Sequence, residues 1–208
     1  IYQLQDDEMH KPHTISTKYK NHLDSKNEGY AWIFFLIAPI LTFFLAIRNF
    51  ENKSLRKFIV LFGGLYGLFF IPIPDSDATR YQDFYSNLKN YNFDAYWHDI
   101  TNIASPENQF PDVYAYTLFF IGRIFSDNPQ FFYFITALVY FFVFVKLIGF
   151  IYDNNHNILN KKQGLFFIGI IFLFGFSGGV NGVRWPSALI VYLLGAIRLL
   201  TQNNIKYL

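Results

Sequence analysis

The sequence contains no cysteine and little charge. Without cysteine the chain has no disulfide framework, no thiolate chemistry and no cysteine-ligated metal. Only 15% of its 208 residues are charged, whereas an ordinary soluble domain has about a quarter. The formal net charge is +2 and no stretch forms a basic stripe, so we expect no nucleic-acid partner.

Apolar and aromatic residues dominate what is present. Hydrophobic residues make up 52% of the chain, aromatic residues 22%, and the mean hydropathy is +0.20. These residues are bunched into blocks long enough to enter a bilayer. We therefore predict an all-α, polytopic integral membrane bundle of about five to six membrane segments. A polar tail over residues 1–29 is expected to precede a transmembrane domain over 30–208.

Each predicted membrane segment is an apolar stretch. Pro39 is expected to kink the first stretch, and Gly63, Gly64 and Gly67 in the second allow close helix approach. In chain order the stretches are Tyr30–Ile47, Phe58–Ile73, Val113–Phe125, Gln130–Tyr152, Gly164–Phe176 and Ser187–Leu200.

Charge in the loops predicts the orientation. Loop 48–57 has four basic residues and one acid, which favours the cytoplasmic side. Segment 74–112 carries seven acids against two basic residues, so we expect an extracytoplasmic loop with amphipathic helices. The predicted location is a cytoplasmic membrane, with a multi-pass chain.

Two topologies are open for Val113–Phe125, which is short for a crossing. If it crosses, Lys161 and Lys162 lie on the unfavourable outer face. If it is re-entrant or interfacial, they lie inside, and Arg184 faces outside with the 74–112 loop. The positive-inside rule favours the second arrangement.

The stretch from Pro74 to Tyr85 is a candidate polar site at a membrane surface. Asp75 or Ser76 is expected to cap a helix, which places Asp77, Arg80, Tyr81 and Phe84 on one face. A second amphipathic helix is expected to start near residue 92. Two interpretations stay open: a capped interfacial helix with a local ion pair, or a substrate-facing site. His98 and Asp99 are either acid–base partners or a solvated pair.

Arg184 is the second candidate. Gly178-Gly179 is expected to break one helix, Asn181 to cap the next, and Pro186 to stand in its first turn. A guanidinium at a helix N-terminus is a natural phosphate site. The alternative is an arginine that reaches lipid headgroups.

These motifs together resemble the EpsG-like family, Wzy-type membrane proteins that polymerise exopolysaccharide, capsule or O-antigen units. The resemblance runs from about residue 30 to 208 and is carried by three elements. They are Ser76-Asp77-x-x-Arg80-Tyr81, Asp127-Asn128-Pro129-Gln130 and Asn181-Gly182-Val183-Arg184. Trp185 stands where the family usually has glutamine, and the match covers the family's N-terminal half, so we expect a truncated polymerase-like domain.

The resemblance implies a glycosyltransferase reaction on undecaprenyl-diphosphate-linked oligosaccharide, with membrane lipid and other polysaccharide assembly proteins as further partners. Arg184, and second Arg80, would stabilise the leaving diphosphate. Asp77 or Asp75 would orient or deprotonate the acceptor hydroxyl. The other expected substrate-binding residues are Tyr81, Tyr85, Trp97 and Asn181. We expect no cofactor and no metal.

Two other classes remain open. A transporter of lipid-linked sugar would also have broken helices whose N-termini face anions, and it would show internal repeats. A non-catalytic membrane partner in a polysaccharide assembly complex is the other alternative.

Overall fold

The computed structural model describes residues 28–88, 90–105, 112–155, 169 and 185–202. All regular structure in these residues is helical, which confirms the all-α prediction. The helices are Glu28–Ile37, α2 (Pro39–Arg48), α3 (Arg56–Leu68), α4 (Asp77–Asn87), α5 (Phe93–Thr101), α6 (Val113–Phe125), α7 (Pro129–Asn155) and α9 (Trp185–Gln202).

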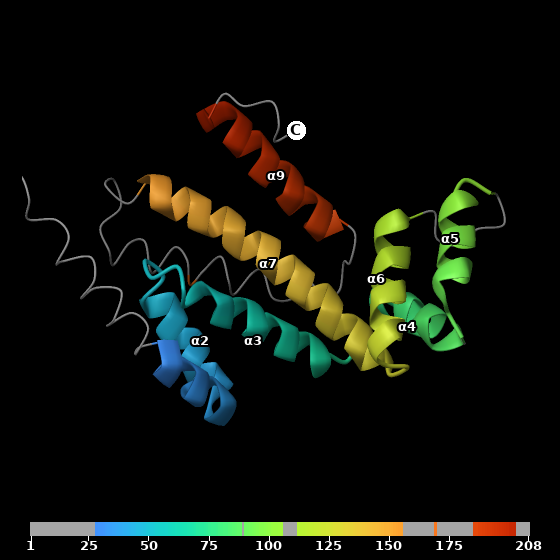
Figure 1. Cartoon of the computed structure of the whole chain (residues 1–208), viewed down its shortest axis with the longest axis horizontal. Coiled ribbons are helices and arrows are strands. Elements are labelled where there is room, and N and C mark those ends of the chain that lie inside the picture. Colours follow the sequence, from blue (N-terminus) through green and yellow to red (C-terminus); the bar gives the residue numbers. More distant parts are fainter. Residues whose placement is uncertain (1–27, 89, 106–111, 156–168, 170–184, 203–208) are drawn as a thin grey trace, which may run out of the picture.

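Helix α7 is the element on which most of the others pack (Figure 1). Its 27 residues extend over about 40 Å. Helices α3 and α9 lie along it, and α4 and α6 contact it near its start. Within the described part of the chain, α7 is the one helix long and apolar enough to cross a membrane, which agrees with the predicted segment Gln130–Tyr152.

Glycines allow α3 to approach α7 closely. A Cβ atom added at Gly67 would lie 2.3 Å from the backbone oxygen of Tyr133, and one at Gly63 would lie 2.1 Å from the Phe141 ring. Ordinary carbon contacts are about 3.5–4.0 Å, so even a methyl group would force the helices apart. The predicted role of these small residues is confirmed.

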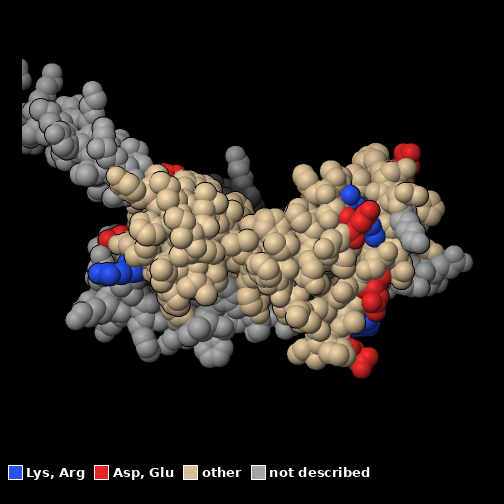
Figure 2. Space-filling view, turned by 90° about the horizontal axis from the view of Figure 1, so that it is seen from below, with Lys and Arg blue, Asp and Glu red and all other residues tan. Residues whose placement is uncertain are grey.

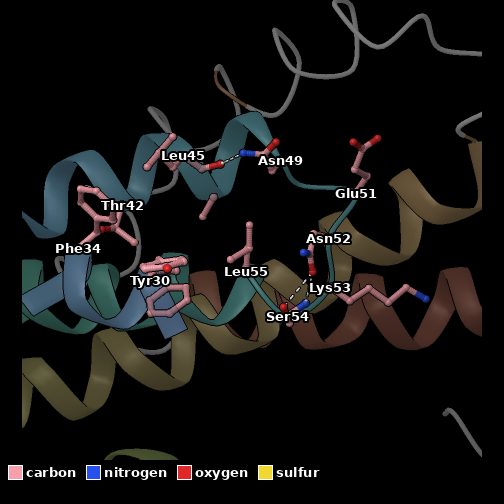
Figure 3. Close-up of a pocket in the computed structure, with 13 residues that line it drawn as sticks. Tyr30, Phe34, Thr42, Leu45, Asn49, Glu51, Asn52, Lys53, Ser54 and Leu55 are labelled. Carbon is pink, nitrogen blue, oxygen red and sulfur yellow. Dashed lines mark hydrogen bonds between the residues drawn. The ribbon is translucent and has the colours of Figure 1, made fainter. Parts of the chain in front are cut away.

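The first predicted segment, Tyr30–Ile47, is divided into two short helices. The helix Glu28–Ile37 ends before Ala38, and α2 begins at Pro39. Tyr30 and Asn49 line the same cavity of about 810 Å³ (Figure 3), whereas a continuous helix would separate them by about 28 Å. The break expected at Pro39 is therefore a sharp bend between two helices and not a kink within one continuous helix, because proline cannot continue the hydrogen-bond ladder.

The remaining predicted segments are shorter as helices or lie outside the described residues. Helix α3 ends at Leu68, five residues before the predicted end at Ile73. Helix α6 has the predicted bounds, 13 residues long, and α9 covers the predicted Ser187–Leu200. The segment Gly164–Phe176 and most of the 1–29 tail lie outside the described residues; helix Glu28–Ile37 begins one residue before the expected end of that tail.

Charged side chains gather at the two ends of the molecule. On the face shown in Figure 2, a broad uncharged band separates one charged group from the other. One end contains loop 49–55 and the last turns of α7, and the other contains α4 and α5 (Figure 1). The two loops whose charge predicted opposite sides of a membrane thus lie at opposite ends of the structure.

Candidate functional site

Helix α4 begins at the predicted cap. The Ser76 hydroxyl accepts a hydrogen bond from the Thr79 amide at 3.3 Å, and the Thr79 hydroxyl donates to the Ile73 carbonyl at 2.6 Å. This satisfies one of the otherwise unpaired amides of the first turn. Asp75 precedes the cap with a φ of 61°, a left-handed conformation that aspartate adopts more readily than most residues. The cap therefore fixes the direction in which α4 leaves the apolar segment before it.

Asp77 and Arg80 form an ion pair on the open side of α4. The Arg80 guanidinium donates to the Asp77 carboxylate, and both side chains are more than half exposed. Asp77 also lies in the first helical turn, where a negative charge is favourable. The two predicted catalytic residues of this helix are thus accessible to a substrate.

Tyr81 and Tyr85 lie on the inner side of α4. Tyr81 is 4% exposed and Tyr85 is fully buried. Their rings pack against Phe132, with centroids 6.2 Å and 5.5 Å away. No ring face of either tyrosine is open to a sugar, so we assign both to the core and not to substrate binding. Tyr81, which the helical spacing aligned with Arg80 in the sequence, and Tyr85 both face α6 and α7.

Tyr85 also fixes α4 to the end of α6. Its hydroxyl donates to the Ser126 carbonyl at 2.6 Å, and the Arg123 guanidinium carbon lies 4.5 Å from its ring centroid. Arg123 donates to the Tyr85 carbonyl and pairs with Asp127. Burial raises the pKa of Tyr85 to about 12, an effect that the nearby guanidinium reduces only in part. The hydroxyl therefore stays protonated and acts as a structural donor.

Helix α5 presents an exposed aromatic pair. Asn92 caps this predicted helix, accepting from the Ala95 amide at 2.9 Å. The Trp97 ring is 56% exposed and stacks on Phe93 with centroids 6.3 Å apart. Such an open indole face suits a sugar ring, so the predicted binding role of Trp97 is compatible with its position.

His98 and Asp99 are not arranged as a simple acid–base pair. His98 Nδ1 lies 3.7 Å from Asp99 Oδ1, beyond hydrogen-bond distance. The other Asp99 oxygen accepts from the Tyr91 hydroxyl at 2.8 Å. Burial, and then this carboxylate, raise the pKa of Tyr91. Asp99 is therefore engaged in holding Tyr91.

A cleft that the sequence did not predict lies where α6 and α9 begin. It has a volume of about 480 Å³ and contains Asp112, Tyr114 and Ser187. Asp112 caps α6 by accepting from the Tyr114 amide at 2.9 Å, and the Tyr114 hydroxyl donates to Ser187 Oγ at 3.2 Å. A carboxylate and two hydroxyls on an apolar wall are suitable partners for sugar hydroxyls. The sequence feature that could have indicated this cleft is Asp112, an acid directly before the apolar stretch Val113–Phe125.

Helices α4 and α9 contact different parts of α6. Helix α4 contacts α6 through rings at Phe119, whereas α9 contacts it at Tyr114. Asp77 and Arg80 pair with each other on α4, whereas the hydrogen bond to the start of α9 comes from Tyr114. Pro186 stands in the first turn of α9, as predicted. Arg184 immediately precedes this helix in the chain, but Arg184 and Asn181 lie outside the described residues.

No family model, curated protein or solved structure matches this chain. Within the described residues, no group of three or more histidine, aspartate or glutamate side chains is placed to hold a metal ion. Metal independence and the resemblance to the EpsG-like family both stay predictions.

Proposed function

We propose that this chain is a polytopic membrane protein that joins undecaprenyl-diphosphate-linked oligosaccharide units into a polysaccharide outside the cytoplasmic membrane. The apolar surface supports membrane insertion. Leu36, Ile37 and Ile71 are each about 80% exposed, a large cost in water but not in lipid. Helix α7 supports it too, because it is apolar on all sides and only half of its most apolar stretch of 18 residues is buried.

The observation that carries the polymerase assignment is the cleft at the start of α9. It places a carboxylate and hydroxyls beside the helix that follows Asn181-Gly182-Val183-Arg184 in the chain. Sugar hydroxyls fit these groups, and a diphosphate fits an arginine at a helix N-terminus. A lipid-linked sugar presents both chemistries at the membrane surface.

The proposed reaction is a displacement at the anomeric carbon of the growing glycan. The hydroxyl oxygen of the incoming unit forms the new glycosidic bond, and the bond from that carbon to the carrier diphosphate breaks. Arg184 stabilises the charge on the departing diphosphate, with Arg80 as a second cation. Asp77 takes the hydroxyl proton or, with Asp75, orients the acceptor, while Trp97 stacks on a sugar. Asp112 is a further carboxylate for sugar hydroxyls.

Substitution of Arg184 tests this proposal in cells whose polymer depends on the complete protein. Arg184→Ala removes a charged donor to the leaving group, which typically lowers a rate about 10²–10³-fold. Chain extension should stop and single lipid-linked units should accumulate. Arg184→Lys keeps the charge but loses the two-pronged hydrogen bonds, so it should yield short chains at most.

Arg198→Lys is the matched control, because it makes the same change near the other end of α9. Polymer of normal length is expected from it. Normal-length polymer from Arg184→Lys would refute the role of Arg184 as a diphosphate clamp. If repeat units instead stay on the cytoplasmic face, the chain is a transporter and the polymerase proposal fails.

A further inference from the structure

A basic groove lies between α3, α7 and α9. Figure 1 shows where these helices lie relative to α4, and the groove is at the end of the molecule away from α4. Its volume is about 540 Å³. The cationic residues that line it are Lys53, Arg56, Lys57, Lys146 and Arg198. They come from three separate parts of the chain, so the groove exists only in the folded protein.

Positive charge exceeds negative charge in this groove. Asp153 is its acidic lining residue and pairs with Arg56 and Lys53. Glu28 pairs with Lys57 at the edge. Among the described residues that line the groove or pair at its edge, five cations stand against these two acids. A ligand with one or more negative charges would complement it.

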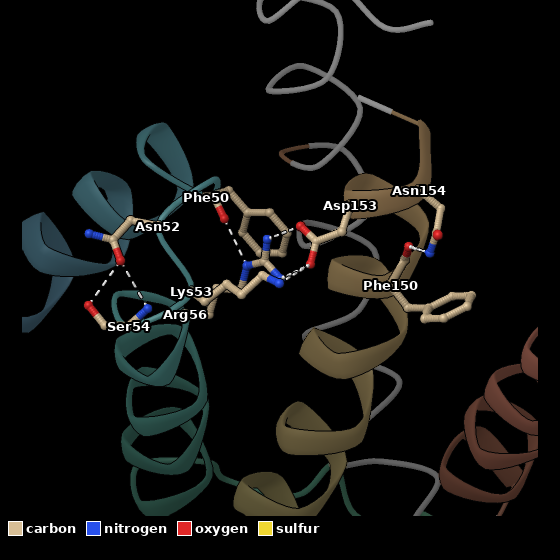
Figure 4. Close-up of polar contacts among 8 residues, drawn as sticks. All are labelled: Phe50, Asn52, Lys53, Ser54, Arg56, Phe150, Asp153 and Asn154. Carbon is tan, nitrogen blue, oxygen red and sulfur yellow. Dashed lines mark hydrogen bonds and ion pairs between the residues drawn. The ribbon is translucent and has the colours of Figure 1, made fainter. Parts of the chain in front are cut away.

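The floor of the groove is rigid. The Arg56 side chain is 10% exposed and forms two hydrogen bonds to the Asp153 carboxylate, at 2.6 Å and 3.1 Å (Figure 4). Its Nε donates to the Phe50 carbonyl at 2.8 Å. A Cβ atom at Gly149 would lie 2.5 Å from Arg56 Nη1, so glycine provides the space for this guanidinium. Arg56 is therefore part of the structure and leaves ligand contacts to the other cations.

Lys146 and Arg198 stand above aromatic rings at the groove. The Lys146 ammonium is 5.4 Å from the centroid of Phe142, and the Arg198 guanidinium carbon is 5.6 Å from that of Phe150. These cation–π contacts favour conformations in which the two charged groups lie beside the groove over conformations in which they extend into water. The two cations come from α7 and α9 and thus approach a ligand from different helices.

The wall of the groove is apolar. Val60, Leu61 and Val145 line it, together with Phe142, whose side chain is 55% exposed. A small soluble anion would satisfy the cations and leave this wall uncovered. A molecule that joins a phosphate to acyl chains satisfies both, and basic pockets between membrane helices bind such headgroups.

We propose that this groove binds an anionic phospholipid, with its phosphate between Lys146 and Arg198 and its acyl chains against the Val60 wall. The proposal rests on the membrane placement in the proposed function, but not on polymerase activity. The groove is at the end predicted to be cytoplasmic.

Quenching of Trp32 fluorescence by brominated lipid tests the proposal, because Trp32 lines the groove and is 42% exposed. The full chain with Trp97→Phe and Trp185→Phe keeps Trp32 as its single tryptophan. It is placed in phosphatidylcholine bilayers that contain increasing fractions of dibrominated phosphatidylglycerol or dibrominated phosphatidylcholine. We expect quenching by dibrominated phosphatidylglycerol to saturate at a lipid fraction at least tenfold lower than quenching by dibrominated phosphatidylcholine.

Charge variants assign this preference to the groove. Each basic residue near a membrane surface contributes about fivefold to anionic-lipid affinity, so Lys146→Gln with Arg198→Gln should weaken binding about 25-fold. Lys146→Arg with Arg198→Lys keeps both charges and should keep the preference. Arg48→Gln removes an exposed charge at the same end but outside the groove, and should change little.

Three results would overturn the proposal. One is equal quenching by the two brominated lipids, and another is an unchanged preference in the double glutamine variant. The third is loss of the preference when millimolar inorganic phosphate is added, which would assign the site to a free anion. A wild-type circular dichroism spectrum shows that each variant is folded. Polymer formation is not a readout, so failure here leaves the proposed function standing.

Discussion

At the scale of single residues, two ion pairs of similar chemistry have different consequences. Arg56 is almost buried and is held in a two-pronged contact by Asp153, 97 residues away in the chain. Asp77 and Arg80 are neighbours on one helix, and water reaches both. An exposed pair of this spacing contributes at most about 0.5 kcal/mol, whereas a buried charge left without its partner costs several times more. The first pair therefore stabilises the fold, and the second is available for chemistry.

Removal of the Asp153 charge should destabilise the protein. In Asp153→Asn the buried Arg56 loses its ionised partner, and we expect the free energy of unfolding to fall by about 1.5–3 kcal/mol. Thermal or denaturant unfolding in detergent measures this change. Glu51→Gln is the control, because Glu51 is an exposed acid at the same end of the molecule and should change stability by less than about 0.5 kcal/mol. Equal stability of the two variants would contradict the structural role of Asp153.

Asp77→Asn should leave stability unchanged but stop polymer formation. The loss of one exposed ion pair leaves protein abundance and stability nearly unchanged, within about 0.5 kcal/mol. If Asp77 handles the acceptor hydroxyl, the complete protein should nevertheless stop making polymer. Asp83→Asn changes another exposed acid of α4 and should support normal polymer. Polymer length on a gel and protein level on a blot separate the outcomes, and normal polymer from Asp77→Asn would limit this pair to a surface role.

At the scale of elements, the contact between α3 and α7 determines how closely the described helices pack. Gly63, Gly64 and Gly67 form one face of α3, against which Tyr133, Phe141 and their neighbours on α7 lie without space for a methyl group. Close backbone approach maximises dispersion contacts, which are the main attraction between helices in lipid. The aromatic side chains of α7 then fill the volume that larger residues on α3 would have occupied.

Gly67→Ala should weaken this contact although alanine is the better helix former. The new methyl group would overlap the backbone oxygen of Tyr133, and overpacking of this kind costs about 1–3 kcal/mol. Gly29→Ala is the matched control, because nothing lies within 4 Å of a Cβ atom there. That variant should be neutral, or more stable by up to about 1 kcal/mol. Unfolding midpoints that shift in the same direction in both variants would show that helix propensity, and not packing, governs the site.

At the scale of the whole molecule, charge is separated along its length. The basic groove and loop 49–55 occupy one end, and the Asp77–Arg80 pair and helix α5 occupy the other (Figure 1). A broad uncharged band lies between these ends on the face shown in Figure 2. In a membrane the band would match the hydrocarbon layer and the basic end would face the cytoplasm.

Labelling of single cysteines tests this orientation directly, since the chain has no cysteine of its own. Glu51→Cys and Asn87→Cys place exposed thiols at the two ends. In intact cells, an impermeant maleimide should label the thiol at position 87 and should label that at position 51 only after permeabilisation. The reverse pattern would invert the proposed topology, and labelling of both from one side would exclude a crossing between them.

The sequence by itself determined the features that depend on neighbours along the chain. The predicted apolar segment Gln130–Tyr152 folds as α7, the Ser76 cap starts α4, and Asn92 starts α5. Close approach at Gly67 was also predictable, since a missing side chain has the same consequence in any helix that packs against it. Each of these features follows from local hydrogen bonding or from the local sequence of apolar and small residues.

Only the tertiary structure decided which residues meet across the chain. Pro39 predicted a kink. Tyr30 and Asn49 line one cavity, so the chain bends sharply between them, and the angle of this bend depends on the packing of α2 against α3. The sequence predicted that Tyr85 lies at a membrane surface, but its side chain is buried. Helical periodicity predicts which residues share a face, and it does not predict what covers that face. The Arg56–Asp153 pair, the basic groove and the α6–α9 cleft arise from segments distant in sequence. No local pattern encodes their meeting, because it results from the packing of α3, α6 and α9 around α7.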